Sequence, residues 1–183
     1  SFGINESRDF LSWVEYMVKR FGPERKIILT GISMGASTVL MAAGKPLPSQ
    51  VKGVLADCGF TSAKAIICDV MRKLHLPPQL LYPFVRLGAR LYGGFALEER
   101  SPVEAIARCP LPVIFYHGDH DQLVPHWMSK ANFDACAAPK KLVTIPGAGH
   151  GLAFLCDKEG YLRELVAFCK ENGIPHTDNG LIG

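Results

Sequence analysis

The sequence lacks an apolar run of about 18 residues or more, which a membrane-spanning helix requires, so a membrane segment is not evident. It also lacks a large excess of one charge, because 20 Lys and Arg stand against 17 Asp and Glu and the net charge is +3. Without a basic stripe, nucleic acid is not an expected partner. The chain starts at Ser1 rather than at a methionine, so a signal or anchor before it stays an open alternative.

No Cys-x-x-Cys pair occurs, and the spacing of the six cysteines matches neither a zinc site nor a small disulfide scaffold. The histidines and acids also show no ligand-spaced cluster, so we expect no metal and no other cofactor. Four cysteines lie in apolar segments, which predicts buried, reduced thiols and favours a reducing, cytoplasmic location. These four are Cys58, Cys68, Cys109 and Cys169.

What the sequence does contain is a G-x-S-x-G motif at residues 31–35. The apolar run directly before it is typical of a buried strand, and the residues after it are typical of a helix. A serine on a sharp strand-to-helix turn is the nucleophile elbow of serine hydrolases. Gly31 and Gly35 would allow the tight turn and the close approach of a substrate to Ser33.

Apolar strands alternate with helices along most of the chain. The expected strands are 26–32, 51–57, 111–117 and 141–145. The expected helices are one that Asn5 or Ser7 caps and that ends before Gly22, and three over 36–43, 125–137 and 158–170. This alternation predicts an α/β fold with a mostly parallel, doubly wound sheet of about four strands, in one domain over 1–183 with a loose tail after Pro175.

Residues 60–100 interrupt this alternation, because they contain no obvious strand. Thr61 or Ser62 is expected to cap a first helix, the prolines at 77–78 end it, and a second apolar helix follows. We interpret this segment as a helical cap or lid inserted over an active site.

In a parallel α/β sheet the active site lies beyond the carboxyl ends of the strands. Asp121 follows the third expected strand and His150 follows the fourth, so both would meet Ser33 there. His150 would take the proton of Ser33 and pass it to the leaving group, while Asp121 would orient the imidazole. The oxyanion would accept a hydrogen bond from the backbone N–H of Met34, the residue after the nucleophile.

Four motifs carry these residues: the elbow at 31–35, a D-x-G-F-T-S-like turn at 57–62, H-G-x-x-D-x-x-V-P at 117–125 and G-x-G-H at 147–150. Together they resemble the carboxyl-terminal part of an α/β-hydrolase, in the group of serine esterases that overlaps with prolyl oligopeptidase-like hydrolases. The resemblance covers residues 5–172 and implies that the fifth residue of H-G-x-x-D, Asp121, is the catalytic acid.

Two other acids compete for that role. Asp119 lies two residues before the leading candidate and would instead support the turn, whereas Asp57 ends the second expected strand, where some lipases place their acid. Among the histidines, His117 ends a buried strand and is expected to be structural. His120 and His126 lie near the expected mouth of the site and are expected to be solvent-exposed loop residues.

The resemblance also implies a sheet of eight strands with the nucleophile after the fifth, whereas here Ser33 follows the first of about four. We therefore expect the chain to be part of a longer hydrolase, with the second oxyanion-hole donor upstream of Ser1 and with reduced or no activity on its own. The strand at 26–32 would then present an unpaired apolar edge, through which the chain could associate with itself.

The leading interpretation is a serine hydrolase that cleaves a small-molecule carboxylic ester or acyl substrate through an acyl-serine intermediate. Amide, peptide and thioester cleavage would use the same residues and stay open. One alternative is a non-catalytic binding protein with a hydrolase fold. Another is a dinucleotide-binding domain with Asp57 as the ribose-binding acid, although Ser33 occupies the place of the second glycine of that motif.

Overall fold

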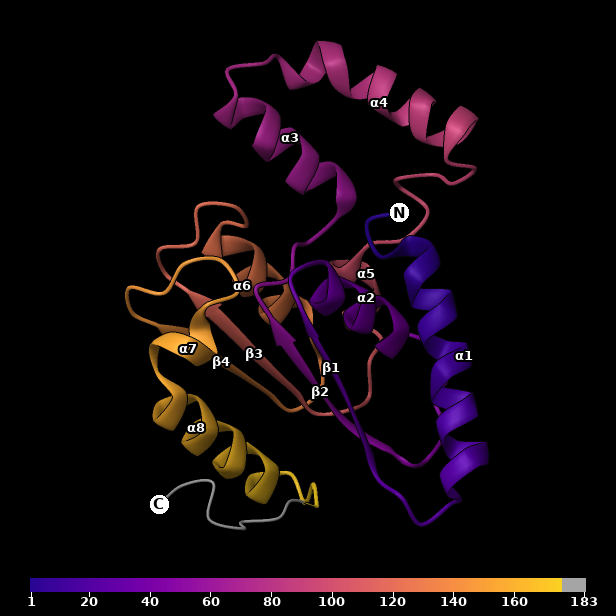
Figure 1. Ribbon diagram of the computed structural model, residues 1–183, viewed down its shortest axis with the longest axis vertical. Helices are drawn as coiled ribbons and strands as arrows, with labels where there is room; N and C mark the ends of the chain where they lie inside the picture. The colour runs from indigo at the N-terminus through magenta and orange to yellow at the C-terminus, as the bar shows by residue number, and fades with distance from the viewer. Residues whose placement is uncertain (176–183) are drawn as a thin grey trace.

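The computed structural model describes residues 1–175 and contains one four-stranded sheet whose strands are all parallel (Figure 1). The strands are β1 (Ile27–Ile32), β2 (Val51–Asp57), β3 (Val113–Gly118) and β4 (Lys140–Ile145). They lie side by side in chain order, β1-β2-β3-β4. The predicted α/β fold with a parallel sheet of about four strands is confirmed. The tail that we expected to be loose after Pro175 lies outside the described residues.

Helices connect the strands and follow the last one. In the described part of the chain they are α1 (Ile4–Phe21), α2 (Met34–Ala43), α3 (Ala63–Lys73), α4 (Pro78–Tyr92), α5 (Pro102–Ile106), α6 (His126–Ala135), α7 (Ala153–Cys156) and α8 (Lys158–Glu171). None of these helices is long and apolar enough to cross a membrane. The expected cap of α1 by Asn5 or Ser7 is wrong, because Gly3 takes the N-cap position in a left-handed conformation, with φ 86°, and supplies no side-chain cap.

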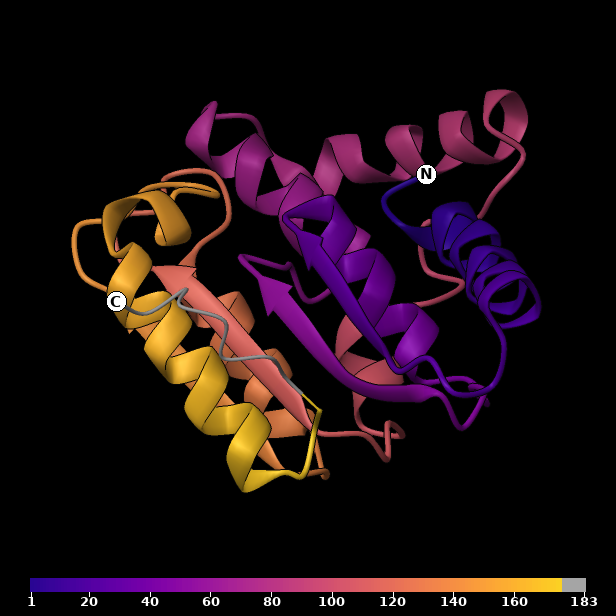
Figure 2. The ribbon, with the colours of Figure 1, turned by 60° about the horizontal axis from the view of Figure 1, so that its bottom comes forward.

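The helices cover the sheet from two sides, as a doubly wound fold requires (Figures 1 and 2). On one side, α1, α2, α5 and the end of α6 pack on the strands around a core that includes Val14, Leu40, Ile106, Phe115 and Cys136. On the other side, α7 and α8 pack mainly on β3 and β4, where the rings of Tyr116 and Tyr161 stack with their centroids 3.6 Å apart. The sheet is therefore packed between two hydrophobic cores, one on each face.

The register of the sheet brings the carboxyl ends of the strands together. The last residue of β1, Ile32, pairs with the last residue of β2, Asp57, which in turn pairs with Tyr116 near the end of β3. Gly118 at the end of β3 pairs with Ile145 at the end of β4. The loops that follow the four strands therefore start at one edge of the sheet, where the candidate site residues lie.

β1 is the outermost strand of the described sheet on the side away from β4, and β2 is its one partner there. The helix α8 lies over the other half of the sheet and leaves one face of β1 uncovered (Figure 2). Ile28 and Ile32 on that face are 40% and 54% exposed. Since strands of parallel sheets are usually buried on both faces, β1 has the sequence of an interior strand in an exposed position.

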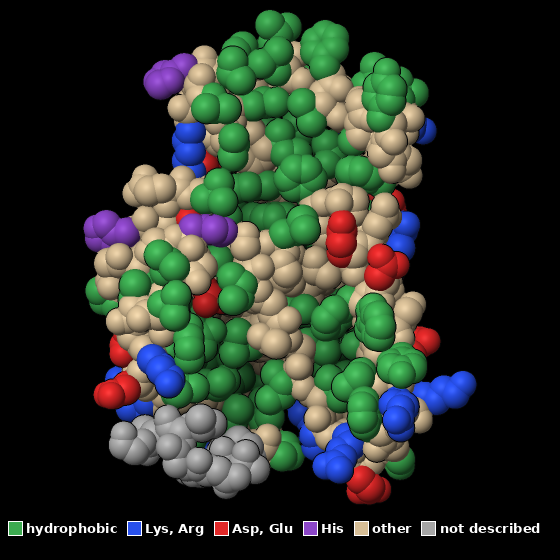
Figure 3. Space-filling view, viewed as in Figure 1, with side chains coloured by type: hydrophobic (Ala, Val, Ile, Leu, Met, Phe, Trp, Pro, Cys, Tyr) green, Lys and Arg blue, Asp and Glu red, His purple; other side chains and the backbone are tan. Residues whose placement is uncertain are grey.

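The segment expected to form a cap is helical, and α3 and α4 stand away from the sheet beyond the carboxyl ends of the strands (Figure 1). Ser62 caps α3, because its Oγ accepts a hydrogen bond from the N–H of Ala65 at 3.0 Å. A small cluster holds the two helices together and comprises Ala63, Cys68, Tyr82 and Leu97. The outer side of α4 is apolar and exposed at Leu80, Phe84, Leu87 and Leu91, and Figure 3 shows hydrophobic side chains over this end of the molecule. That residues 60–100 act as a lid over the active site stays a prediction.

Candidate active site

Ser33 lies on a strained turn between β1 and α2. Its backbone adopts φ 56° and ψ −119°, an uncommon conformation for a residue with a Cβ, and its N–H donates to the carbonyl of Asp57 at 2.8 Å. The turn is so tight that a Cβ on Gly31 would collide with the backbone of Gly35. A Cβ on Gly35 would meet nothing within 4 Å, so that side of the turn is open.

His150 links Ser33 to Asp121. Its Nε2 lies 2.8 Å from Oγ of Ser33, and its Nδ1 lies 2.8 Å from Oδ2 of Asp121. The three residues come from the loops after β1, β3 and β4, and 117 positions separate the serine from the histidine. The structure thus brings together all three residues that the sequence nominates as nucleophile, acid and base.

Asp121 is held as a buried carboxylate. Its side chain is inaccessible to solvent, and its Oδ1 accepts backbone hydrogen bonds from Leu123 at 2.8 Å and Val124 at 2.9 Å. His117 Nε2 lies 3.2 Å from Oδ2. Burial by itself raises the pKa of this carboxyl, but the hydrogen bonds from His117, His150 and the two backbone groups outweigh it and lower the pKa to about 2. Asp121 therefore stays ionised beside His150.

The two competing acids have other contacts. Asp119 is exposed, and its Oδ1 lies 2.7 Å from Nδ1 of His120 and accepts from the N–H of Gly147 at 2.6 Å, which ties the loop after β3 to the loop after β4. Asp57 is 1% exposed, and the hydroxyl of Tyr161 lies 3.4 Å from its Oδ2. Burial raises the pKa of Asp57, against the opposing influence of nearby His117.

The other nearby histidines do not touch Ser33. His117 is fully buried, with Nδ1 2.6 Å from Oγ of Ser129 and Nε2 2.8 Å from the carbonyl of Val124. His120 is exposed and bonded to Asp119, and His126 Nε2 lies 2.8 Å from the hydroxyl of Thr144. His117 thus supports the loop that carries Asp121. His120 is an exposed loop residue as expected, whereas His126 begins α6, is only partly exposed and packs its ring against that of His117.

Met34 is the first residue of α2, so its N–H is among those that have no acceptor within the helix. Such N–H groups, together with the positive end of the helix dipole, bind negative charge. The side chain of Met34 is 45% exposed, so the surface around it is accessible. This placement suits the predicted oxyanion donor.

Cys58 also lies at the site, although its sequence pattern indicated only a buried thiol. It directly follows β2, as Ser33 directly follows β1, and it too has a positive φ, of 46°. Its Sγ lies within 4.8 Å of donor atoms of Asp121 and His150. Burial and the nearby charge of Asp57 raise the pKa of the thiol to about 12. Its position after a strand end was the signal that could have nominated it.

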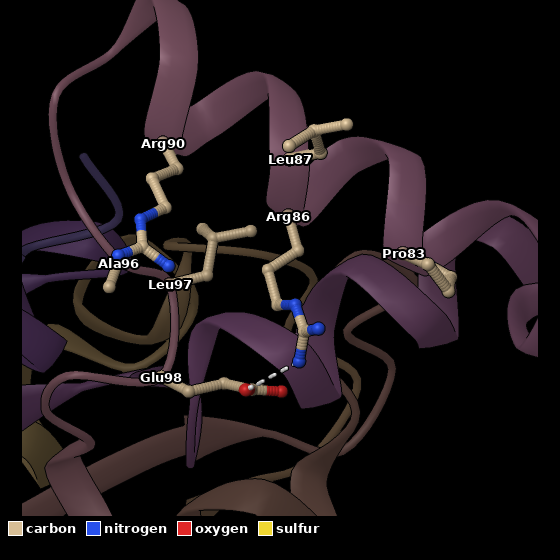
Figure 4. A pocket seen from close by; sticks show the side chains of 7 residues that line it. All are labelled: Pro83, Arg86, Leu87, Arg90, Ala96, Leu97 and Glu98. Atoms are coloured by element: carbon tan, nitrogen blue, oxygen red, sulfur yellow. Dashed lines mark hydrogen bonds and ion pairs between the residues drawn. The ribbon is translucent and has the colours of Figure 1, made fainter.

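Two cavities lie on the cap, and a third, of about 580 Å³, lies between residues 44–52 and 108–111. One of about 510 Å³ lies between α4 and residues 96–98, and Figure 4 shows Arg86 pointing from the helix to Glu98, with an N–O distance of 3.5 Å. A neighbouring cavity of about 420 Å³ shares Arg86 and Glu98 and reaches Lys64 on α3. Neither of these two cap cavities is lined by Ser33 or His150.

Comparison of the sequence with known proteins identifies a family and several relatives. The model of the prolyl oligopeptidase family matches residues 1–173. YqkD of Bacillus subtilis, an uncharacterized protein, is 25% identical over 169 residues, which cover 92% of this chain and 55% of YqkD. Protein bem46 of Schizosaccharomyces pombe is 26% identical over 164 residues, which cover 88% of this chain and 49% of bem46. The chain therefore spans about half the length of these relatives.

Solved structures show the same fold. A puromycin-hydrolyzing peptidase of Mycobacterium tuberculosis superposes with a TM-score of 0.70 at 21% identity, over 95% of this chain and 26% of the peptidase. The esterase domain of a Rhodothermus marinus protein superposes with a TM-score of 0.60 at 17% identity, over 90% of this chain and 68% of that domain. Peptidases and esterases thus share this arrangement of strands and helices.

Proposed function

Since this chain belongs to the prolyl oligopeptidase family of α/β-hydrolases, we propose that it is a serine hydrolase that cleaves carboxylic esters with Ser33, His150 and Asp121. The observation that carries the proposal is the position of His150, which lies 2.8 Å from both the serine hydroxyl and the aspartate carboxylate. A histidine held in this way can move a proton between nucleophile and leaving group.

The geometry supports a two-step reaction. Nε2 of His150 would accept the proton of Ser33 as Oγ attacks the carbonyl carbon of the ester. The oxyanion that forms would accept a hydrogen bond from the N–H of Met34. His150 would then give its proton to the leaving alcohol, and an acyl-serine would remain. A water molecule, deprotonated by the same histidine, would attack the acyl-serine and release the acid.

We prefer esters as the substrate class because the cap is apolar, and a cap that closed over the site would favour a hydrophobic substrate. Leu80, Phe84, Leu87 and Leu91 form an exposed apolar stripe along α4, which suits a hydrophobic acyl or alkyl group. The exposed Arg86 and Arg90 lie beside it and line the cavity next to residues 96–98. Amide, peptide or thioester cleavage would use the same triad, so the assay must compare these bonds directly.

A dinucleotide-binding role gains no support from the fold. Such sheets bind the cofactor where the order of the strands reverses, and the described strands follow one another without a reversal. Ser33 also stands where the pyrophosphate would need a glycine.

The test is labelling with a fluorophosphonate, which reacts with activated serines, followed by peptide mapping. We expect label on Ser33, loss of label in Ser33→Ala and in His150→Ala, and full label in Ser49→Ala, which changes an exposed serine outside the site. The rates of hydrolysis of p-nitrophenyl esters of increasing chain length are then compared with those of the matching anilides. This comparison shows whether the chain cleaves esters or amides faster. Label that persists in Ser33→Ala would refute the assignment, and faster cleavage of the anilides would refute the preference for esters.

A further inference from the structure

Three different metal-binding side chains meet at the carboxyl edge of the sheet. Cys58 follows β2, Asp121 follows β3 and His150 follows β4, and one donor atom from each lies within 4.8 Å of the other two. Their separation in the sequence explains why the spacing of cysteines and histidines predicted no metal site. A thiol, an imidazole and a carboxylate form a donor set that suits Zn²⁺ and similar thiol-binding ions far better than Mg²⁺ or Ca²⁺.

The backbone holds the thiol at this place. Cys58 has φ 46°, a conformation that is unfavourable for a residue with a Cβ and is therefore found where the surroundings enforce it. Its N–H donates to the carbonyl of Tyr116 at 2.9 Å, which fixes it against β3. Backbone hydrogen bonds from Ser33 and Gly151 to the thiol place it beside the nucleophile.

We propose that Cys58, Asp121 and His150 form a binding site for Zn²⁺ or a similarly thiol-binding divalent ion, and that the bound ion inhibits the enzyme. The inhibitory part rests on the proposed function, whereas the binding does not. Water would complete a tetrahedral shell. Zinc lies about 2.0–2.3 Å from nitrogen, oxygen and sulfur ligands, so the Cys58 and His150 side chains would move by about an ångström to close on the ion.

Binding would involve proton release without any redox change. The ion displaces the thiol proton of Cys58, and it displaces a ring proton when the ligating nitrogen of His150 carries one; these protons pass to water. The side chain of His150 is 25% exposed, which gives the ion access from solvent. While the ion holds His150, the ring cannot accept the proton of Ser33, and the hydrolytic reaction stops.

The test uses Co²⁺ as a spectroscopic substitute for Zn²⁺ on the purified 183-residue chain. A cobalt–thiolate bond gives a charge-transfer absorption, which we expect to saturate at one ion per chain and to disappear when Zn²⁺ is added. We expect Cys58→Ala to lose the absorption and His150→Ala to weaken Co²⁺ binding at least about tenfold. The matched control is Cys156→Ala, which removes an exposed thiol outside the site and should keep the absorption.

Two further variants keep the outcomes separate. Ser33→Ala should lose the fluorophosphonate label but keep the cobalt absorption, so failure of the hydrolase proposal would leave the metal site standing. Cys58→Ser, with its fold checked by circular dichroism, replaces sulfur by oxygen at nearly constant size and should also lose the absorption. The proposal is overturned if Cys58→Ala binds Co²⁺ with the same absorption, if the absorption follows Cys156, or if Zn²⁺ inhibits Cys58→Ala as strongly as the unaltered chain.

Discussion

At the scale of single residues, His150 is held from both ring nitrogens, and this decides which proton it can take. Asp121 faces Nδ1 and Ser33 faces Nε2, each at 2.8 Å. A carboxylate at Nδ1 stabilises the tautomer with a proton there, which leaves Nε2 as the acceptor for the serine proton. An amide in place of the carboxylate can donate to Nδ1 and so favour the wrong tautomer.

We therefore predict that Asp121→Asn lowers kcat for an ester by about 10⁴ while the fold is kept. Asp119→Asn should leave kcat nearly unchanged, because the amide oxygen can still accept from the N–H of Gly147. Steady-state kinetics of both variants with one p-nitrophenyl ester checks this. Equal losses in the two variants would show that Asp121 is not the acid that orients His150.

Asp57 allows a prediction about pH and stability. Because burial raises its pKa, the folded chain keeps this proton at pH values where the unfolded chain, with an ordinary pKa near 4, has lost it. Its contribution to the free energy of unfolding is therefore largest at acid pH and falls as the pH rises from about 4 towards the raised pKa. We expect the difference in stability between the unaltered chain and Asp57→Asn to decrease over this range in urea titrations.

Asp121 serves as a control, because its contribution to stability should change with pH in the opposite direction to that of Asp57. Its pKa is lowered to about 2, so its stabilising contribution is complete above about 4 and is lost as the pH falls towards 2. The difference between the unaltered chain and Asp121→Asn should therefore decrease in the acid direction. A stability difference for Asp57→Asn that increases with pH would contradict the raised pKa.

The residues of the candidate site were predictable to the extent that each follows a strand end in a short motif. Ser33, Asp121 and His150 met this condition, and the structure brings them into contact. Cys58 follows a strand end too, but nothing in its neighbours distinguishes a thiol at the site from a thiol in the core. The contact of His117 with Asp121 depends on the folded path of the loop between them, which spacing does not reveal.

At the scale of secondary structure, the four strands and the long helices were predictable because their apolar residues recur with a clear period. The helices α5 and α7 were not, since five and four residues are too few to show one. The start of α1 was missed because Gly3, and not a polar side chain, occupies its N-cap. The alternation of strands and helices predicted that the sheet is parallel. It did not predict which strands lie next to one another.

β1 gives a prediction at this scale. Its uncovered face and free edge should allow chains to associate, so the apparent mass in light scattering should rise with concentration. We expect Ile28→Lys to reduce this association, because a charge on an edge strand opposes pairing with another strand. Leu87→Lys on α4 is the matched control, since it places the same charge on an exposed apolar residue of the cap. Association that only Leu87→Lys prevents would assign the contact to the cap instead.

At the scale of the whole molecule, the chain spans about half the length of YqkD and bem46. The site in the described residues has one predicted oxyanion donor, the N–H of Met34. Loss of one such donor costs about 10²–10³ in kcat. We therefore predict that a chain extended upstream to the length of these relatives hydrolyses the same ester about 10²–10³ times faster than the 183 residues do. Equal kcat values for the two chains would contradict a second donor upstream.

The contact between Ser33 and His150 joins loops that lie 117 positions apart in the sequence. It can form only when β1, β3 and β4 are all in register, so a partly folded chain would leave the serine unactivated. The rate of fluorophosphonate labelling would then count correctly assembled molecules. In a denaturant series, labelling lost before the helical signal would reveal a state that keeps its helices while the strand ends have separated.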